Sequence, residues 1–217
     1  MAESLMRIQH LLTSAAIALT FQGAASASDL CATPREEALI QSYAYDQRPG
    51  IPLAIGARNL EIPEAVFASG MKEGDVVGVM ATPDIATEIW TSMDEAWGAD
   101  AKVGLVFSPS NQHAFALPHL LPVQVDGSED GYLDVYADDG NGVHSHIQLK
   151  YVEAIYATDL KNADGVSETK GISLFGPDGD LIISVYASIK GDVYSEAAEN
   201  GFATTWDLIA SMPQACE

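Results

Sequence analysis

The strongest constraint on the fold is a change in the spacing of apolar residues near position 100. Between residues 34 and 97, apolar side chains recur at the spacing expected for the buried face of a helix. From residue 102 onward they alternate within short segments that are rich in Val, Ile, Phe and Tyr and are separated by Pro, Gly, Asn and Asp. The sequence therefore predicts a mostly helical part over residues 34–98, followed by an antiparallel sheet and a C-terminal helix over residues 102–217.

Helix-start signals divide the first part into separate helices. Thr33 stands before Pro34 and Thr82 stands before Pro83, so in each case a capping hydroxyl precedes a proline at the first helical position. Gly98 is expected to end the second of these helices. The sequence between the two starts predicts two further short helices.

The second part contains the predicted strands and the closing helix. A Gly-Pro-Asp-Gly turn at residues 176–179 is expected to join two apolar strands as a hairpin. Residues 194–212 return to a helical spacing. The layout is an α+β fold with N-terminal helices, a large antiparallel β-sheet and a C-terminal helix. The predicted strands are AKVGLVFS, HAFAL, GYLDVYA, SHIQLKYVEAIYAT, GISLFG and DLIISVYAS.

The first 27 residues have the pattern of a secretory signal peptide. Arg7 precedes an apolar run over residues 11–21, and Ala25-Ser26-Ala27 forms a small-x-small cleavage site. We therefore expect a mature chain of residues 28–217 that is periplasmic or secreted and does not insert into a membrane after cleavage. A retained N-terminal anchor is the alternative.

Two cysteines lie close to the ends of the mature chain, Cys31 and Cys216. In an exported protein they favour a disulfide that ties the termini together. In the chain-entropy model a loop of this length contributes about 5 kcal/mol. Unpaired thiols or a bridge between two chains are the alternatives.

The formal net charge of −21 excludes one class of partner and restricts another. Such a field repels the phosphate backbone, so no nucleic acid is expected as a partner. An anionic ligand would need a local group of cations to bind.

Four segments carry a resemblance to a known family: IWTSMDEAWG, GYLDV, HSHI and ISLFGPDGDLIISVYAS. Their order resembles the haem-utilisation carrier family typified by ChuX and HutX, which is related to half of a HemS-type protein. In that family the corresponding pieces are a helix ending in Trp-Gly, a Gly-Tyr-Phe-Asn-Leu strand, a Gly-His-Ile at a strand start, and a Phe-Asn-x-x-Gly hairpin. The resemblance implies a single HemS/ChuX-like domain that holds haem or a related tetrapyrrole, and it allows a homodimer.

The resemblance also implies a ligand for haem iron. His146 matches the histidine of the family's Gly-His-Ile, although Ser145 stands where the family has glycine. The family's other histidine falls on Phe107. Family carriers are cytosolic, whereas this chain carries an export signal.

The histidines of the mature chain are the candidate ligands on chemical grounds. His144 and His146 are two residues apart and would project from the same face if a strand begins at His144. One imidazole could then bind iron while the other contacts a propionate. His113 and His119 flank a short apolar strand, and either could replace the ligand lost at Phe107; His113 is nearer to that position and is the candidate second ligand. Surface or hydrogen-bonded structural histidines are the alternative.

A haem pocket also needs apolar walls and cations. Phe107 and Tyr132 are expected walls, and Lys150 is an expected partner for a propionate. The wider set of candidate aromatic residues and cations is Phe107, Phe115, Tyr132, Tyr151, Tyr156, Phe175, Tyr186, Lys102, Lys150 and Lys170.

Together these features predict an exported haem-binding protein that acts as a haem carrier or buffer without catalytic turnover. A non-haem periplasmic ligand-binding or interaction protein on the same fold is the first alternative, and a haem-degrading enzyme is the second. A hydrolase is not expected, because Ser145 lacks the context of a nucleophile elbow.

Overall fold

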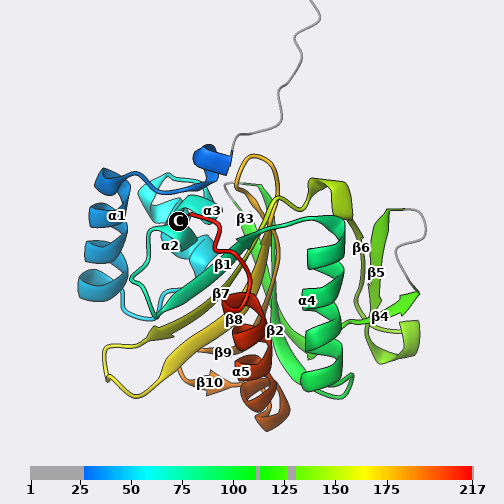
Figure 1. The fold of residues 1–217 in the computed structure, drawn as a ribbon. Coiled ribbons are helices and arrows are strands. Elements are labelled where there is room, and N and C mark those ends of the chain that lie inside the picture. The colour runs from blue at the N-terminus through cyan, green and yellow to red at the C-terminus, as the bar shows by residue number, and fades with distance from the viewer. Residues whose placement is uncertain (1–26, 111–112, 127–130, 217) are drawn as a thin grey trace, which may run out of the picture.

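Helices surround a central antiparallel sheet in the computed structural model, which describes residues 27–110, 113–126 and 131–216 (Figure 1). The strands are β1 (Val76–Met80), β2 (Lys102–Ser110), β3 (His113–Leu120), β4 (Val123–Asp126), β5 (Tyr132–Tyr136), β6 (His144–Gln148), β7 (Ala154–Lys161), β8 (Glu168–Phe175), β9 (Leu181–Ile189) and β10 (Asp192–Val193). The α-helices are α1 (Pro34–Gln41), α2 (Leu53–Leu60), α3 (Glu64–Ser69), α4 (Pro83–Ala96) and α5 (Glu196–Ala210).

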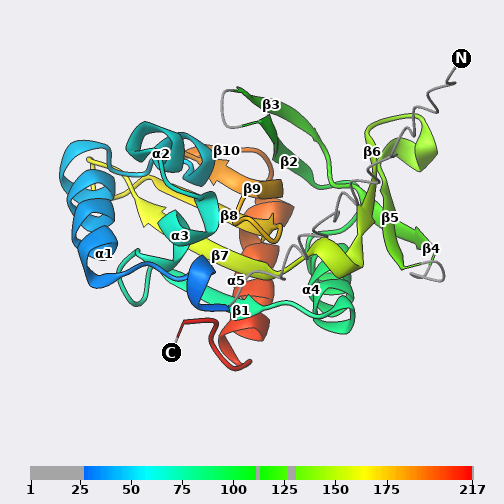
Figure 2. The ribbon, with the colours of Figure 1, turned by 90° about the horizontal axis from the view of Figure 1, so that it is seen from above.

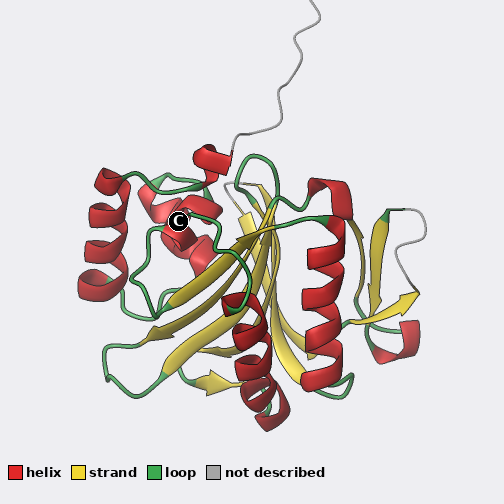
Figure 3. Ribbon diagram, viewed as in Figure 1, coloured by secondary structure: helices red, strands yellow, loops and turns green. Residues whose placement is uncertain are grey.

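The predicted helix starts after Thr33 and Thr82 and the predicted helix end before Gly98 are confirmed. Thr33 caps α1, accepting from the backbone N–H of Glu36, whose side chain bonds back to the Thr33 backbone. The Thr82 side chain caps α4 by accepting from the backbone N–H of Ile85. Gly98 follows α4 with φ +83°, a left-handed conformation that glycine adopts without strain. Figure 3 shows α1, α2 and α3 grouped apart from α4 and α5.

The predicted large antiparallel sheet is present, and a second, smaller antiparallel sheet accompanies it. The larger has seven strands in the order β1-β7-β8-β9-β2-β3, with β10 paired to β9, and the smaller has three in the order β4-β5-β6. The sequence predicts residues 145–158 as one strand segment, but a 3-10 turn at Leu149–Tyr151 separates β6 from β7. Figure 2 shows the smaller sheet set apart from the larger one, beyond α4.

Strand β1 lies inside the part predicted as mostly helical. Its sequence is a short run of apolar residues, for which periodicity cannot distinguish a buried strand from a helix. It pairs with β7 along its whole length, from Val76 opposite Thr158 to Met80 opposite Ala154. The first strand of the described chain therefore becomes an edge of the larger sheet.

Alternate side chains of the larger sheet enter two different cores. In β7, Ile155 and Ala157 join the core that α4, α5 and the smaller sheet cover. Ala154 and Tyr156 point the other way, into the core that α1–α3 cover. Strands β7, β8 and β9 are thus buried on both faces over most of their length, whereas β3 at the far edge of the sheet keeps Phe115 exposed.

The two ends of the described chain, near Cys31 and Cys216, meet at the β1 edge of the larger sheet. Cys31 and Cys216 form the predicted disulfide, with their Cα atoms 5.7 Å apart. The tail before Cys216 follows β1: the Ala215 N–H donates to the Gly78 carbonyl at 2.8 Å, and the Gly78 N–H donates to the Gln214 side chain at 2.9 Å. The tail therefore covers part of an edge that would otherwise expose unpaired backbone groups. Among the described residues, no helix has the length and apolar character needed to cross a bilayer.

Candidate functional site

The predicted histidine pair lies on the outer face of the smaller sheet. Strand β6 begins at His144, so the condition for His144 and His146 to share a face is met. Leu133 and Ile147 point to the opposite face, into the core beneath the sheet. The facing pairs of β5 and β6 are Tyr136 with His144, Asp134 with His146, and Tyr132 with Gln148.

Three rings form a cluster on this outer face. The His144 ring stacks on that of Tyr136, with centroids 5.3 Å apart and planes 13° apart. The His146 ring stands nearly perpendicular to both, 5.8 Å from Tyr136 and 5.6 Å from His144. The His146 side chain remains 52% exposed, so a ligand can reach it from solvent.

Asp134 fixes one side of the His146 ring. Its Oδ1 lies 2.5 Å from His146 Nδ1, within hydrogen-bond distance of that nitrogen. Within the described part of the chain, no hydrogen bond engages His146 Nε2. The ring is held at one nitrogen and accessible at the other.

Tyr132 and Lys150 are close to the pair in the register or in the sequence, but they differ in their surroundings. Tyr132 starts β5 on the same outer face and is 37% exposed. Lys150 follows β6 directly, is exposed, and holds its Nζ 4.8 Å from the ring centroid of Tyr151. Tyr132 therefore belongs to the face that carries the histidines, whereas Lys150 contacts its own neighbour.

Phe107 and His113 belong to the β2–β3 hairpin. Phe107 is half-buried against the core under α4 and lies opposite Phe115. The side chain of His113 lies outside the described part of the structure. Its backbone starts β3, and the strand ends at the smaller sheet roughly 23 Å further on, at about 3.3 Å per residue. Figure 2 shows the start of β3 away from β5 and β6, so the structure does not bring this position beside His146.

Three of the other candidate wall residues are core residues instead. Tyr156, Phe175 and Tyr186 are almost completely buried between the larger sheet and the N-terminal helices. Tyr186 also accepts a hydrogen bond at its hydroxyl from the backbone N–H of Leu53. Their burial assigns them to the core of the fold.

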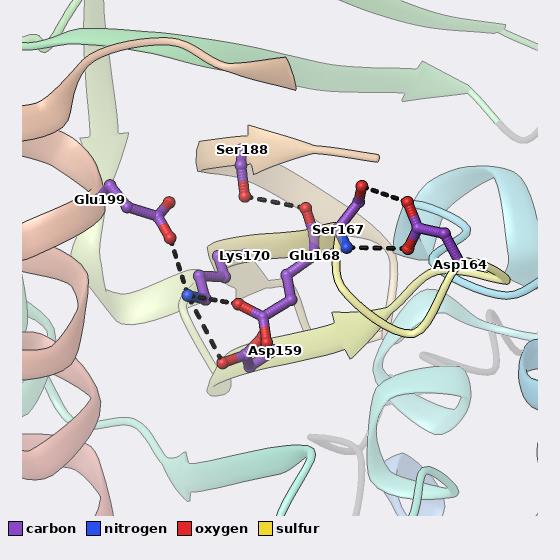
Figure 4. A network of polar contacts seen from close by, with 7 residues as sticks. All are labelled: Asp159, Asp164, Ser167, Glu168, Lys170, Ser188 and Glu199. Atoms are coloured by element: carbon purple, nitrogen blue, oxygen red, sulfur yellow. Dashed lines mark hydrogen bonds and ion pairs between the residues drawn. The ribbon is translucent and has the colours of Figure 1, made fainter. Parts of the chain in front are cut away.

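Lys170 is also unavailable to a ligand, because carboxylates surround it (Figure 4). Its Nζ lies 2.6 Å from Glu168, 2.8 Å from Glu199 and 3.9 Å from Asp159. Burial alone would lower the pKa of Lys170, but the hydrogen bonds with Glu168 and Glu199 raise it above its usual value. Burial raises the pKa of Asp159 to about 6, although Lys170 acts in the opposite direction. This cluster joins β7, β8 and α5.

A second cation that already has a carboxylate partner, Arg58, lines a cleft of about 370 Å³ beside α2 and α3. Arg58 contacts Ser108 and lies 3.7 Å from the buried carboxylate of Glu64, whose pKa is raised by burial. Glu61 and Asp180 line the same cleft. The guanidinium is therefore matched by carboxylates and does not create a site for an anion.

Asp134 and Tyr136 are the residues of the cluster that were not predicted. The signal that could have identified them is the hairpin register. A turn over residues 138–142 places Asp134 opposite His146 and Tyr136 opposite His144, because paired residues lie equally far from the turn. Among the described residues, no group of three or more His, Cys, Asp or Glu side chains could hold a metal ion.

Comparison with known proteins relates the chain to others by structure alone. No family profile matches the sequence, and no curated protein matches it. A protein from Erwinia carotovora has a TM-score of 0.60 at 16% identity, covering 82% of this chain and 99% of that one. The haem-binding protein ChuX has a TM-score of 0.57 at 14% identity, covering 81% of this chain and 97% of ChuX.

The haem-degrading enzyme ChuS from Escherichia coli O157:H7 has a TM-score of 0.53 at 11% identity, covering 77% of this chain and 47% of ChuS. The match thus spans about half of ChuS. These likenesses agree with the α+β class predicted from the sequence. The chain has the fold that ChuX and ChuS share.

Proposed function

We propose that this protein binds haem and acts as an exported haem carrier or buffer. The observation that carries the proposal is the histidine pair on the outer face of β5 and β6, where His146 is exposed and oriented by Asp134. The ChuX-like fold supports it, because ChuX is a haem-binding protein. A carrier without turnover needs only to hold and release its ligand.

The residues present suit haem better than a bare metal ion. Haem brings four nitrogen ligands of its own, so a single imidazole is enough to hold its iron. His146 offers that imidazole, whereas a bare ion would need three or more protein ligands, which the described residues do not gather. Tyr132, Tyr136 and His144 present flat rings against which a porphyrin could rest.

Charge is the constraint on binding, since the propionates of haem are anionic and the chain carries −21. Lys150 is the exposed cation closest in sequence to His146, on the 3-10 turn that follows β6. We assign it to a propionate. The same net charge favours release of an anionic ligand to a partner once the iron bond is broken.

Export is supported by the signal-like residues 1–27, which lie almost entirely outside the described structure, and by the disulfide. Disulfides persist in oxidising compartments such as the periplasm. We propose a periplasmic or secreted location, which fractionation of the cells that produce the protein would test. Recovery of an uncleaved chain in the membrane would favour the retained anchor.

The test of haem binding is a hemin titration of residues 28–217 followed in the Soret region, beside His146→Ala and His113→Ala. We expect a saturable band near one equivalent, weakened by roughly tenfold or more in His146→Ala because the iron–imidazole bond is lost. The His113 variant tests the predicted second ligand: unchanged binding would exclude it. A flat titration of the wild-type chain would overturn haem binding and favour the non-haem binding protein.

The likeness to ChuS makes haem degradation the enzymatic alternative. It is tested by adding a reductant and oxygen to the haem-loaded protein. A stable Soret band is the result expected of a carrier. Progressive loss of the band, at a rate above that of free haem, would make the protein an enzyme.

A further inference from the structure

We infer that Asp134 is a positioning residue, which holds His146 in the tautomer that presents Nε2 to haem iron and biases the site toward the ferric form. The inference rests on the proposed haem binding and deepens it. The observation is the 2.5 Å contact between Asp134 Oδ1 and His146 Nδ1.

The tautomer follows from the chemistry of the two groups. An ionised carboxylate only accepts hydrogen bonds, so Nδ1 must carry the hydrogen and donate it. In the neutral ring the lone pair is then on Nε2, the nitrogen that no hydrogen bond engages within the described residues. An iron-binding histidine needs a lone pair on its outward nitrogen, and this contact supplies it.

The orientation of the ring is fixed as well as its tautomer. Asp134 and His146 are directly opposite each other on adjacent strands, so their backbones set the distance between the side chains. The rings of Tyr136 and His144 stand nearly perpendicular to that of His146, at 85° and 74°, and restrict its rotation. The imidazole is therefore ordered before a ligand arrives, which reduces the entropy lost on binding.

The carboxylate also changes the basicity of the imidazole as an iron ligand. A histidine that donates its second N–H to a carboxylate is a more basic ligand than one bonded to water, and such partners typically matter 10–100-fold for metal affinity. Added negative charge stabilises ferric iron more than ferrous iron. Asp134 should thus favour uptake of hemin and lower the reduction potential of the bound haem.

The experiment compares Asp134→Asn and Asp134→Ala with Asp139→Asn in the mature chain. Asp139 is a matched control: it lies exposed in the turn of the same hairpin, and its left-handed backbone, φ +50°, is one that asparagine tolerates. We expect Asp134→Asn to weaken hemin binding by about tenfold. If ferrous binding is unchanged, the midpoint potential rises by about 59 mV, the equivalent of that tenfold change for one electron. Asp139→Asn should change neither quantity.

A second measurement needs no haem. The imidazole nitrogen-15 shifts of His146 in the ligand-free protein should report hydrogen on Nδ1, and Asp134→Ala should move the population toward hydrogen on Nε2. Equal shifts in the wild type and Asp134→Ala would overturn the positioning role.

The outcomes separate the two proposals. A wild-type chain that gives no Soret band ends the haem proposal and the inference with it, whatever the tautomer. If hemin binds and His146→Ala weakens it, but Asp134→Asn matches Asp139→Asn in affinity and potential, only the inference about Asp134 fails. If His146→Ala binds hemin as tightly as the wild type, the site itself is wrong.

Discussion

The two sheets of this protein treat their polar groups in opposite ways. In the larger sheet these groups are paired within the protein. The C-terminal tail, tied by the disulfide, covers part of the β1 edge, and three carboxylates surround Lys170. The smaller sheet leaves its outer face open, with His146 half exposed and held by a single carboxylate. The difference indicates that the larger sheet maintains the fold, whereas the outer face of the smaller sheet is accessible to a ligand.

The largest effect on stability should come from opening the β1 edge. Replacing both Cys31 and Cys216 with serine removes a link across 185 residues, and the chain-entropy model predicts a loss of about 5 kcal/mol in the free energy of unfolding. Urea unfolding of the oxidised wild type and the double variant measures it. Hemin affinity of the folded fraction should not change; a parallel loss of affinity would mean that the two sheets are not independent.

Removing the cation of the Lys170 cluster should have the next largest effect. Lys170→Met leaves three carboxylates close together with no counter-charge, which should cost about 3 kcal/mol of unfolding free energy. Lys161→Met is the control, because that lysine is exposed at the end of β7. Equal stabilities of the two variants would show that the cluster does not hold β7, β8 and α5 together.

The pH dependence of stability tests the contact between α4 and the smaller sheet. Asp94 on α4 accepts from the backbone N–H of Gln124 on β4 at 2.9 Å, and burial raises its pKa to about 6. Its pKa in the unfolded chain is lower, about 3.9, so the folded state disfavours ionisation. The contribution of Asp94 to stability is present at low pH and is lost as the pH rises through 6.

Between pH 5 and pH 8 this loss should be roughly 1 kcal/mol. Asp94→Asn, which keeps an acceptor for Gln124, should remove that part of the slope. Unfolding midpoints of the wild type and of Asp94→Asn, measured at several pH values, test this expectation. Identical slopes for the wild type and the variant would contradict the raised pKa.

The smallest effect on stability is expected in the smaller sheet. His146→Ala and Asp134→Ala remove an exposed pair, which should change the free energy of unfolding by less than about 1 kcal/mol. Thermal unfolding measures this, and the same variants should nevertheless lose hemin affinity. A large loss of stability would instead assign the pair a structural role.

Local signals in the sequence predicted the helices and one hairpin, but not the separation of the sheets. The caps at Thr33 and Thr82 and the turn at residues 176–179 are read from neighbouring residues, and all are present. Strand β1 was missed because a short apolar run has no informative period. The division into two sheets depends on which distant strands pair, and no local pattern reports it.

The candidate site was predictable only in part for the same reason. The two-residue spacing of His144 and His146 is a local property, and it correctly placed them on one face. The contact with Asp134 is a cross-strand property that requires the register of the hairpin. The position of Phe107 and of the His113 backbone, at one end of the β2–β3 hairpin, depends on the topology of the whole larger sheet.

The most direct test of the central claim is where a haem analogue binds. Gallium(III) protoporphyrin IX is diamagnetic, so it can be titrated into the isotope-labelled mature chain while backbone and histidine signals are followed by NMR. We predict that the largest shifts fall on β5 and β6, with His146 foremost, and that β7, β8 and α5 change little. Shifts concentrated on the larger sheet, or none at a saturating concentration, would contradict the assignment of ligand binding to the smaller sheet.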